Sequence, residues 1–287
     1  MPRTKAGAPR STGESFREYG RGVAGGLLFS LPLLYTMEVW HSGFTMPPLR
    51  QMAYVLLALV LLLGYNRYAG LHPDSSWAEV AIDSVEEMGI GLLLSAIVLF
   101  LIGRVTPDQH FDEILGRIVV EAVTVAIGVS VGTAQLGGNQ ETGKTGMTGK
   151  SNPSFGGQLI LAVCGAVLFA ANVAPTEEIV LIGIELSGYH LAVLGLATMA
   201  LGALILFYSD FRGSKRSASP NGFGGVVRGA VITYAVGLVA SAAILWFFGR
   251  FDGVGTAAIV GQTVALGVAS TIGASAGRLL LQGADGD

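Results

Sequence analysis

The stretch Ser95–Val105 reads Ser-Ala-Ile-Val-Leu-Phe-Leu-Ile-Gly-Arg-Val, and a related stretch, Ser241–Phe251, reads Ser-Ala-Ala-Ile-Leu-Trp-Phe-Phe-Gly-Arg-Phe. Both stretches end a long apolar run with Gly-Arg, as expected of a membrane helix that reaches the bilayer surface. Similarity between distant parts of one chain indicates a repeated architecture. The pair therefore suggests that the chain is a duplication.

Two further pairs of segments recur in the same order, at offsets of 140 to 146 residues. The segment Gly116–Gly132 shares small and β-branched positions with Gly261–Gly277. The segment Leu28–Glu38 matches Leu168–Glu178, including a Thr and a Glu near its end. Apolar helices resemble one another by chance, but three matches in one order predict two related halves.

The composition is that of a membrane protein, since 51% of the residues are hydrophobic and only 13% are charged. Soluble domains have about 25% charged residues, so a soluble enzyme is excluded. The net charge of -3 argues against a nucleic-acid partner. A helix needs about 20 apolar residues to span a bilayer. Eight stretches meet this test: Gly22–Trp40, Met52–Tyr68, Val80–Ile102, Ile114–Leu136, Gly157–Ile184, Leu191–Asp210, Val226–Gly249 and Ala257–Leu281.

The predicted fold is thus all-α and polytopic, with two four-helix repeats. Four spans return the chain to its starting side, so both halves have the same orientation and are related by an axis along the membrane normal. The predicted domains are an amino-terminal tail, 1–21, a first repeat, 22–136, a Gly/Thr/Ser-rich linker, 137–156, and a second repeat, 157–287.

The distribution of positive charge predicts the orientation in the membrane. Most of the 17 Lys and Arg residues fall in the amino-terminal tail and in the other segments on the same side of the bilayer. Positive charge is retained on the cytoplasmic side, so both termini are expected there. The lipid bilayer is the expected partner, and a homo-oligomer is left open.

Repeated small residues predict close contact between helices. Gly128 and Gly132 recur as Gly273 and Gly277, and in each pair three residues separate the two glycines. Such ridges let helix backbones approach closely in lipid. A pore lining, where small residues leave room for an ion, is the alternative.

Acidic residues in membrane helices are candidates for function, because an ionised carboxylate is costly there. Neither Glu121 nor the acidic cluster of the third span has an acidic counterpart in the second half, so a site built from them is asymmetric. The primary acidic candidates are Glu38, Glu121, Glu177 and Glu178, and the secondary ones are Asp83, Glu86 and Glu87.

The segment Ala171–Glu178 combines a helix break with polar side chains. Pro175 has no N–H, so the carbonyl of Ala171 loses its partner in the helix. Asn172 and Thr176 supply polar support beside this break, and Pro32 creates a comparable defect before Glu38. Oxygen ligands of this kind suit a hard cation, whereas a desolvated carboxyl can carry a proton.

Both groups of acids also have simpler interpretations. Glu38 and Glu178 can lie in water near the membrane interface. Asp83, Glu86 and Glu87 follow Ser-Ser-Trp and can complement the positive end of a helix dipole. The choice between these alternatives depends on the depth of each carboxylate.

The segment Asn172–Glu178, together with Ile127–Gly132, resembles an uncharacterised family of bacterial inner-membrane proteins that span the membrane several times. The resemblance covers the chain from about Glu18 to Leu281. It implies a location in the bacterial inner membrane and carries no established activity or catalytic residues.

The predicted function is transport of a small cation or proton, through a polar passage between the two halves. The alternative is a membrane scaffold, sensor or lipid-binding module that transports nothing. An intramembrane enzyme is not expected, because no Ser-His or paired catalytic Asp arrangement emerges. No catalytic residue and no cofactor is predicted, and the sequence leaves a metal unknown.

Overall fold

A computed structural model describes residues 12–69, 76–135, 155–213 and 222–279 of the chain. These residues form ten helices and no strand. Seven helices are long and apolar enough to cross a membrane, and the number is eight if one bent pair counts as a single span. The predicted all-helical polytopic membrane fold is therefore confirmed.

The first set of helices surrounds a buried central helix, α5. Every residue of α5 from Val120 to Gly132 is buried, and α5 contacts each of the other four helices of its set. These helices are α1 (Thr12–Leu34), α2 (Met37–Thr45), α3 (Pro48–Ala69), α4 (Trp77–Leu101) and α5 (Phe111–Gln135).

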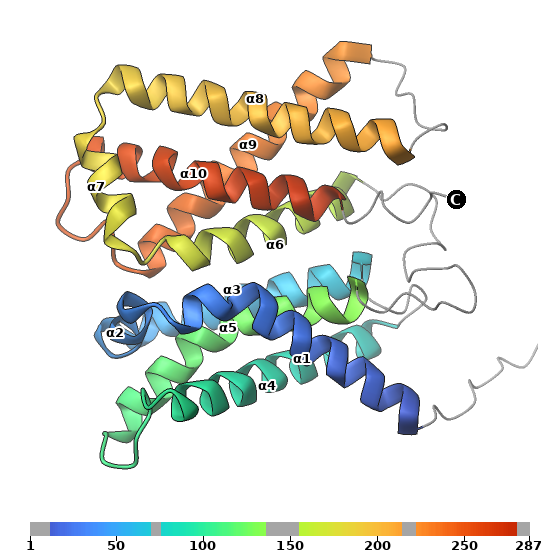
Figure 1. Cartoon of the computed structure of the whole chain (residues 1–287), viewed down its shortest axis with the longest axis vertical. Helices are drawn as coiled ribbons and strands as arrows, with labels where there is room; N and C mark the ends of the chain where they lie inside the picture. Colours follow the sequence, from blue (N-terminus) through green and yellow to red (C-terminus); the bar gives the residue numbers. More distant parts are fainter. Residues whose placement is uncertain (1–11, 70–75, 136–154, 214–221, 280–287) are drawn as a thin grey trace, which may run out of the picture.

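The second set has the same plan, with α10 in contact with each of its four partners. Figure 1 shows the two sets side by side, with α1 and α6 running in the same direction and with α2 and α7 at the same end. We call that end the short-helix end. The duplication stays a prediction. Two sets of helices with the same plan are what a duplicated chain is expected to form. The helices are α6 (Phe155–Val173), α7 (Glu177–Glu185), α8 (Gly188–Gly213), α9 (Gly222–Phe247) and α10 (Thr256–Leu279).

The repeated Gly-Arg stretches end α4 and α9 with the same turn. Gly103 and Gly249 have φ values of 69° and 71°, a conformation that glycine adopts without steric cost. The N–H of Arg104 donates to the Leu99 carbonyl at 2.8 Å, and that of Arg250 donates to the Leu245 carbonyl at 2.9 Å. Each turn thus satisfies a carbonyl at the end of its helix.

The first and fifth predicted spans are each divided into a long and a short helix. The break between α1 and α2 follows Pro32 and bends the chain by 85°. The break between α6 and α7 contains Pro175. The proline breaks are therefore confirmed, although α2 continues to Thr45, beyond the predicted limit at Trp40.

The predicted domain division stays a prediction, and helices cross two of its limits. Helix α1 begins at Thr12, so residues 12–21 of the predicted tail are helical. Residues 155 and 156, the last two of the predicted linker, already belong to α6. Residues 1–11 and 137–154 lie outside the described part of the chain.

The repeated glycines are packing residues. A Cβ atom on Gly25 of α1 would lie 2.3 Å from the Gly132 Cα of α5, and one on Gly165 of α6 would lie 2.1 Å from the Gly273 oxygen of α10. Only glycine permits such close backbone approach, which confirms the packing interpretation of the small-residue ridges.

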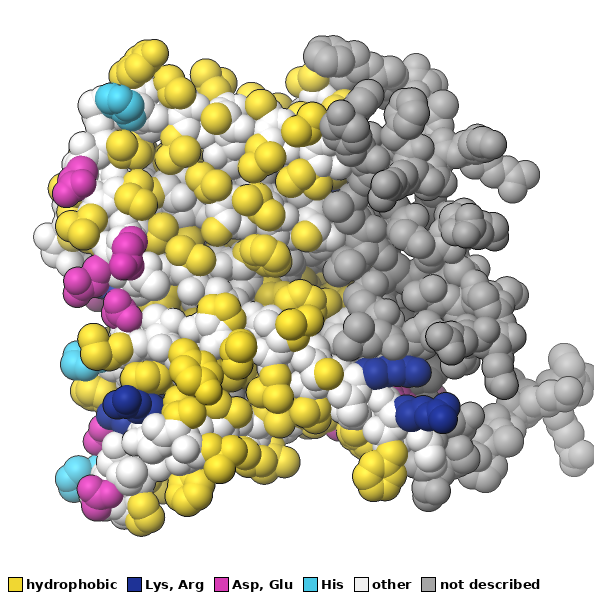
Figure 2. All heavy atoms as spheres, in the orientation of Figure 1, with side chains coloured by type: hydrophobic (Ala, Val, Ile, Leu, Met, Phe, Trp, Pro, Cys, Tyr) yellow, Lys and Arg dark blue, Asp and Glu magenta, His cyan; other side chains and the backbone are white. Residues whose placement is uncertain are grey.

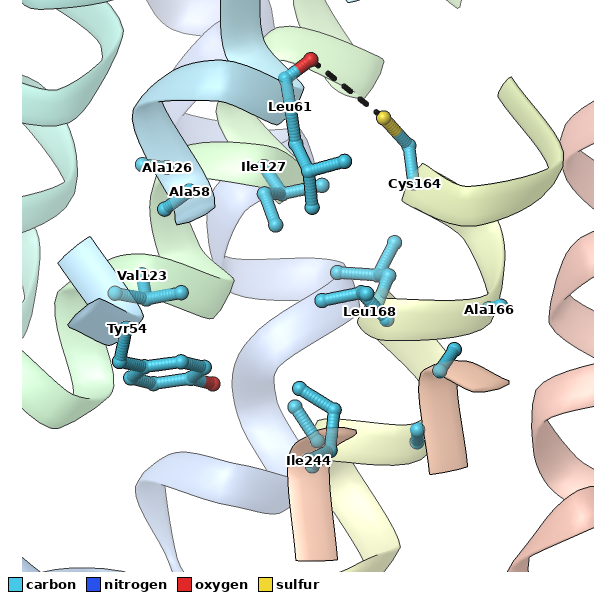
Figure 3. Packing of buried hydrophobic residues seen from close by; sticks show 14 of the residues in the cluster. Tyr54, Ala58, Leu61, Val123, Ala126, Ile127, Cys164, Ala166, Leu168 and Ile244 are labelled. Atoms are coloured by element: carbon cyan, nitrogen blue, oxygen red, sulfur yellow. Dashed lines mark hydrogen bonds between the residues drawn. The ribbon is translucent and has the colours of Figure 1, made fainter. Parts of the chain in front are cut away.

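Apolar side chains fill the contact between the two sets. Figure 3 shows Leu61 of α3 and Ile127 of α5 facing Cys164 and Leu168 of α6, with Ile244 of α9 nearby. The Cys164 thiol donates to the Leu61 carbonyl at 3.6 Å. The predicted polar passage between the two halves is thus replaced here by a packed core.

Candidate functional site: buried carboxyls of the first half

Three of the primary acidic candidates lie at the short-helix end. Glu177 and Glu178 are exposed in the first turn of α7, and Glu38 is half-buried in the first turn of α2. Figure 2 shows acidic side chains gathered at this end of the molecule. These positions agree with the interpretation that the acids lie in water near the membrane interface. The breaks come at the ends of α1 and α6, and the acids lie in the first turns of the short helices that follow the breaks.

Arg250 connects these acids across the two halves. It follows α9 and lies within electrostatic range of Glu38 from α2 and Glu177 from α7. Burial lowers the pKa of Arg250, whereas the charges of the two carboxylates act in the opposite direction. One acid from each half, Glu38 and Glu177, thus lies near the same arginine.

A second ionic contact at the same end also joins the halves. Both terminal nitrogens of Arg50 donate to the Asp252 carboxylate, at 2.6 and 2.7 Å. The hydrogen bonds from Arg50 hold the pKa of Asp252 below its usual value. The Arg50 guanidinium also lies over the Trp246 ring, 5.3 Å from its centroid.

Asn172 has a structural role. Its Nδ2 donates to the carbonyls of Phe29, at 3.1 Å, and Leu168, at 2.7 Å. Its Oδ1 accepts from the backbone N–H of Leu33 at 3.1 Å. A continuous α-helix pairs the carbonyl of residue 29 with the N–H of residue 33. The Asn172 amide therefore bonds to both groups beside Pro32.

The Thr176 side chain also forms a hydrogen bond, at the break between α6 and α7. Its hydroxyl donates to the Val173 carbonyl at 2.9 Å. In the first half, the Thr36 hydroxyl donates to the Pro32 carbonyl at 2.6 Å. The side chains of Asn172, Thr176 and Thr36 are thus hydrogen-bonded within the protein at the two breaks.

Glu121 differs from the other primary acids because it is fully buried. Its side chain is 0% exposed, and neither carboxyl oxygen has a hydrogen-bond partner among the described residues. The hydroxyls of Tyr54 and Thr124 are also buried, and they lie near each other without forming a hydrogen bond of ordinary geometry. Tyr54 lies close enough to Glu121 for electrostatic interaction. We call these three residues the Glu121 site.

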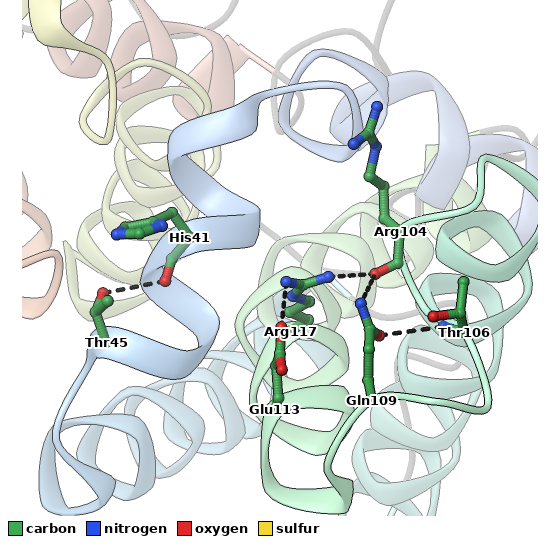
Figure 4. Close-up of polar contacts among 7 residues, drawn as sticks. All are labelled: His41, Thr45, Arg104, Thr106, Gln109, Glu113 and Arg117. Carbon is green, nitrogen blue, oxygen red and sulfur yellow. Dashed lines mark hydrogen bonds and ion pairs between the residues drawn. The ribbon is translucent and has the colours of Figure 1, made fainter.

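The nearest arginine along α5 is turned away from Glu121. Arg117 lies one helical turn before Glu121. It forms an ion pair with Glu113, which lies a further turn toward the start of α5. Arg117 also donates to the Arg104 carbonyl, to which the Gln109 amide donates at 3.4 Å. Figure 4 shows this network, which holds the α4–α5 loop. Arg117 therefore does not neutralise Glu121.

A second buried carboxyl belongs to a hydrogen-bonded group between α3, α4 and α5. The Asn66 Nδ2 donates to Glu87 at 2.7 Å and to the Ser84 hydroxyl at 3.1 Å, and the Ser130 hydroxyl donates to the Asn66 Oδ1 at 3.1 Å. All four residues are at most 8% exposed. We call this group the Asn66 cluster.

The structure separates the secondary candidates. Glu87 is buried in the Asn66 cluster, Asp83 is half-buried, and Glu86 is exposed. Asn66 was not among the predicted site residues, although an amide within the apolar run of α3 is a usable signal.

The second half lacks both carboxyls. The residue aligned with Glu121 is Leu266, which is 0% exposed. In the Gly229–Thr233 segment, which corresponds to the acidic cluster of α4, Thr233 accepts a hydrogen bond from Arg278 at 2.7 Å. The two halves thus also differ in the structure, since the buried carboxyls of Glu87 and Glu121 both lie in the first half.

The described residues contain no group of three or more His, Cys, Asp and Glu side chains placed to hold a metal ion. Glu121 lies near neutral hydroxyls, whereas Glu87 also lies within electrostatic range of Asp83 and Glu86. Glu121 is therefore a single acid in an apolar helical core, and Glu87 is one of three neighbouring acids.

Most of the chain matches a known family of integral membrane proteins. The model of the integral membrane protein family DUF2391 matches residues 18–281. No curated protein and no solved structure matches the chain.

Proposed function

This chain belongs to the DUF2391 family of integral membrane proteins, and from this premise we propose that it moves protons across the membrane through its first half. Glu121 and Glu87 bind the proton in this proposal. The observation that carries it is the burial of Glu121 without a hydrogen-bond partner among the described residues. An unpaired charge in such a core costs several kcal/mol, so the carboxyl is suited to exchange protons.

The surroundings of the two carboxyls favour a proton over a small cation. In the Asn66 cluster, the amide directs its N–H group, not its oxygen, toward Glu87. Hard cations require several oxygen ligands around one point, usually six or more for calcium. A donor facing the carboxylate works against such a shell and is compatible with a proton site.

The two sites lie at different depths of the bundle. Ser130 of the Asn66 cluster is nine residues beyond Glu121 along α5. At 1.5 Å per residue, this corresponds to about 14 Å along the helix. Between them α3 and α5 pack through buried apolar residues such as Ala58 and Ile127. The dry intervening region favours a carrier that changes conformation over an open channel.

The test is proton flux into proteoliposomes that contain the purified full-length protein and a pH-sensitive dye. A potassium diffusion potential drives the protons. We expect Glu121→Gln to reduce the flux to that of protein-free liposomes, because the amide has a similar volume but cannot release a proton. Glu87→Gln should reduce the flux for the same reason.

Glu178→Gln is the matched control. It makes the same chemical change at an exposed position of α7 and should leave the flux at the wild-type level. Wild-type flux in the Glu121→Gln protein, or a wild-type protein no faster than empty liposomes, would contradict the proposal. In the second case a scaffold, sensor or lipid-binding role becomes the better account. Gel filtration shows whether each variant is folded.

A further inference from the structure

A pocket with a basic lining opens among α6, α9 and α10, at the end of the bundle opposite α7. Its volume is about 300 Å³, at the lower limit for small-molecule sites. Phe155, Leu159 and Ile232 contribute apolar walls, whereas Arg228 and Arg278 contribute positive charge. Among the described residues that line it, none is acidic.

Hydrogen bonds from three directions hold the Arg278 guanidinium. Its Nη1 donates to the Thr233 hydroxyl at 2.7 Å and to the Gly229 carbonyl at 3.2 Å. Its Nη2 donates to the Gln158 Oε1 at 3.3 Å. Arg278 is thus placed by α6 and α9, while Arg228 is exposed and can adjust to a ligand.

The pocket lies at the level expected for lipid headgroups. Phe155 is the first residue of α6, and Arg278 is the residue before the last of α10. Two apolar side chains of the pocket wall on α6 are exposed, since Phe155 is 62% and Leu159 37% exposed. Basic pockets between helices at this depth are suited to acidic headgroups.

We propose that this pocket binds the phosphate headgroup of an anionic phospholipid, with Arg228 contacting the phosphate oxygens and the positive charge of Arg278 adding electrostatic attraction. Guanidinium groups match phosphate geometry with paired N–H donors. The apolar wall favours a lipid over a soluble phosphate, because an acyl chain can lie against the exposed Phe155 and Leu159 side chains of α6. The proposal concerns the second half and is independent of proton movement.

The test measures binding of phosphatidylglycerol to the purified full-length protein in detergent by native mass spectrometry. Arg228→Gln should weaken binding about fivefold, the factor that corresponds to about 1 kcal/mol for one basic residue at a membrane surface. Arg228→Lys should retain part of the affinity, because it keeps the charge but not the planar donor pair.

Arg17→Gln is the matched control, since it removes one exposed positive charge from α1, away from the pocket. It should leave the affinity unchanged. Equal weakening by Arg17→Gln and Arg228→Gln, or equal binding of phosphatidylcholine and phosphatidylglycerol, would overturn the site. Glycerol phosphate that binds as tightly as phosphatidylglycerol would overturn the lipid assignment.

Discussion

Asn172 shows how one side chain can compensate for a defect in a neighbouring helix. Its amide bonds to the Phe29 carbonyl and to the Leu33 N–H, on either side of Pro32. It comes from α6, so the compensation also ties the second half to the first. The requirement for an asparagine at position 172 therefore comes from α1 as much as from α6.

We expect Asn172→Ala to destabilise the protein by about 1–3 kcal/mol, the cost of leaving buried polar groups unpaired. The measurement is the midpoint of thermal unfolding of the purified protein in detergent. Adding Pro32→Ala should recover part of the loss, because an alanine restores a backbone N–H and permits a continuous helix. An unchanged midpoint for Asn172→Ala would refute this role.

At the scale of the element, two helix contacts depend on the absence of a side chain. A Cβ atom on Gly116 of α5 would lie 1.9 Å from the Gly43 oxygen of α2, and one on Gly261 of α10 would lie 1.9 Å from the Gly183 oxygen of α7. The atoms in the way belong to the backbone, so no rotamer change relieves the contact. The central helix of each set therefore holds its short helix through glycine.

Gly261→Ala should force α7 and α10 apart and cost about 1–3 kcal/mol, the usual penalty of overpacking. Gly89→Ala is the control, because a Cβ atom on Gly89 of α4 would meet no neighbouring atom within 4 Å. That control should keep or raise stability, since alanine favours a helix by about 1 kcal/mol over glycine. Chemical unfolding in detergent compares the two variants, and equal midpoints would argue against tight packing at Gly261.

At the scale of the whole molecule, the distribution of charge bears on orientation. The positive-inside rule predicts a cytoplasmic amino terminus and, with it, an external short-helix end. Only Cys164 carries a thiol in the wild-type chain, and it is buried. An introduced cysteine can therefore be labelled selectively.

We propose that both termini are cytoplasmic and expect a membrane-impermeant maleimide to label Glu178→Cys in intact bacterial spheroplasts. Arg17→Cys should react only after the membrane is permeabilised. Both positions are exposed, so a difference in labelling reports the side of the membrane. The wild-type protein is the control for Cys164, and the reverse labelling pattern would overturn the orientation.

The apolar runs of the sequence were sufficient to predict a polytopic helical protein, because each stretch long enough to span a bilayer must satisfy its backbone as a helix. The proline breaks and the glycine contacts were also predictable. Proline removes a backbone donor wherever it occurs, and closely spaced glycines leave a groove on one face of a helix.

The depth of each carboxylate was decided only by the tertiary structure. Glu178 and Glu121 both belong to apolar stretches of the sequence, but Glu178 follows a helix break at the short-helix end, whereas Glu121 lies within the central helix of its set. Burial depends on which other helices pack around a residue, as α3 does around Glu87 through Asn66. Those neighbours come from distant parts of the chain, and local pattern does not contain them.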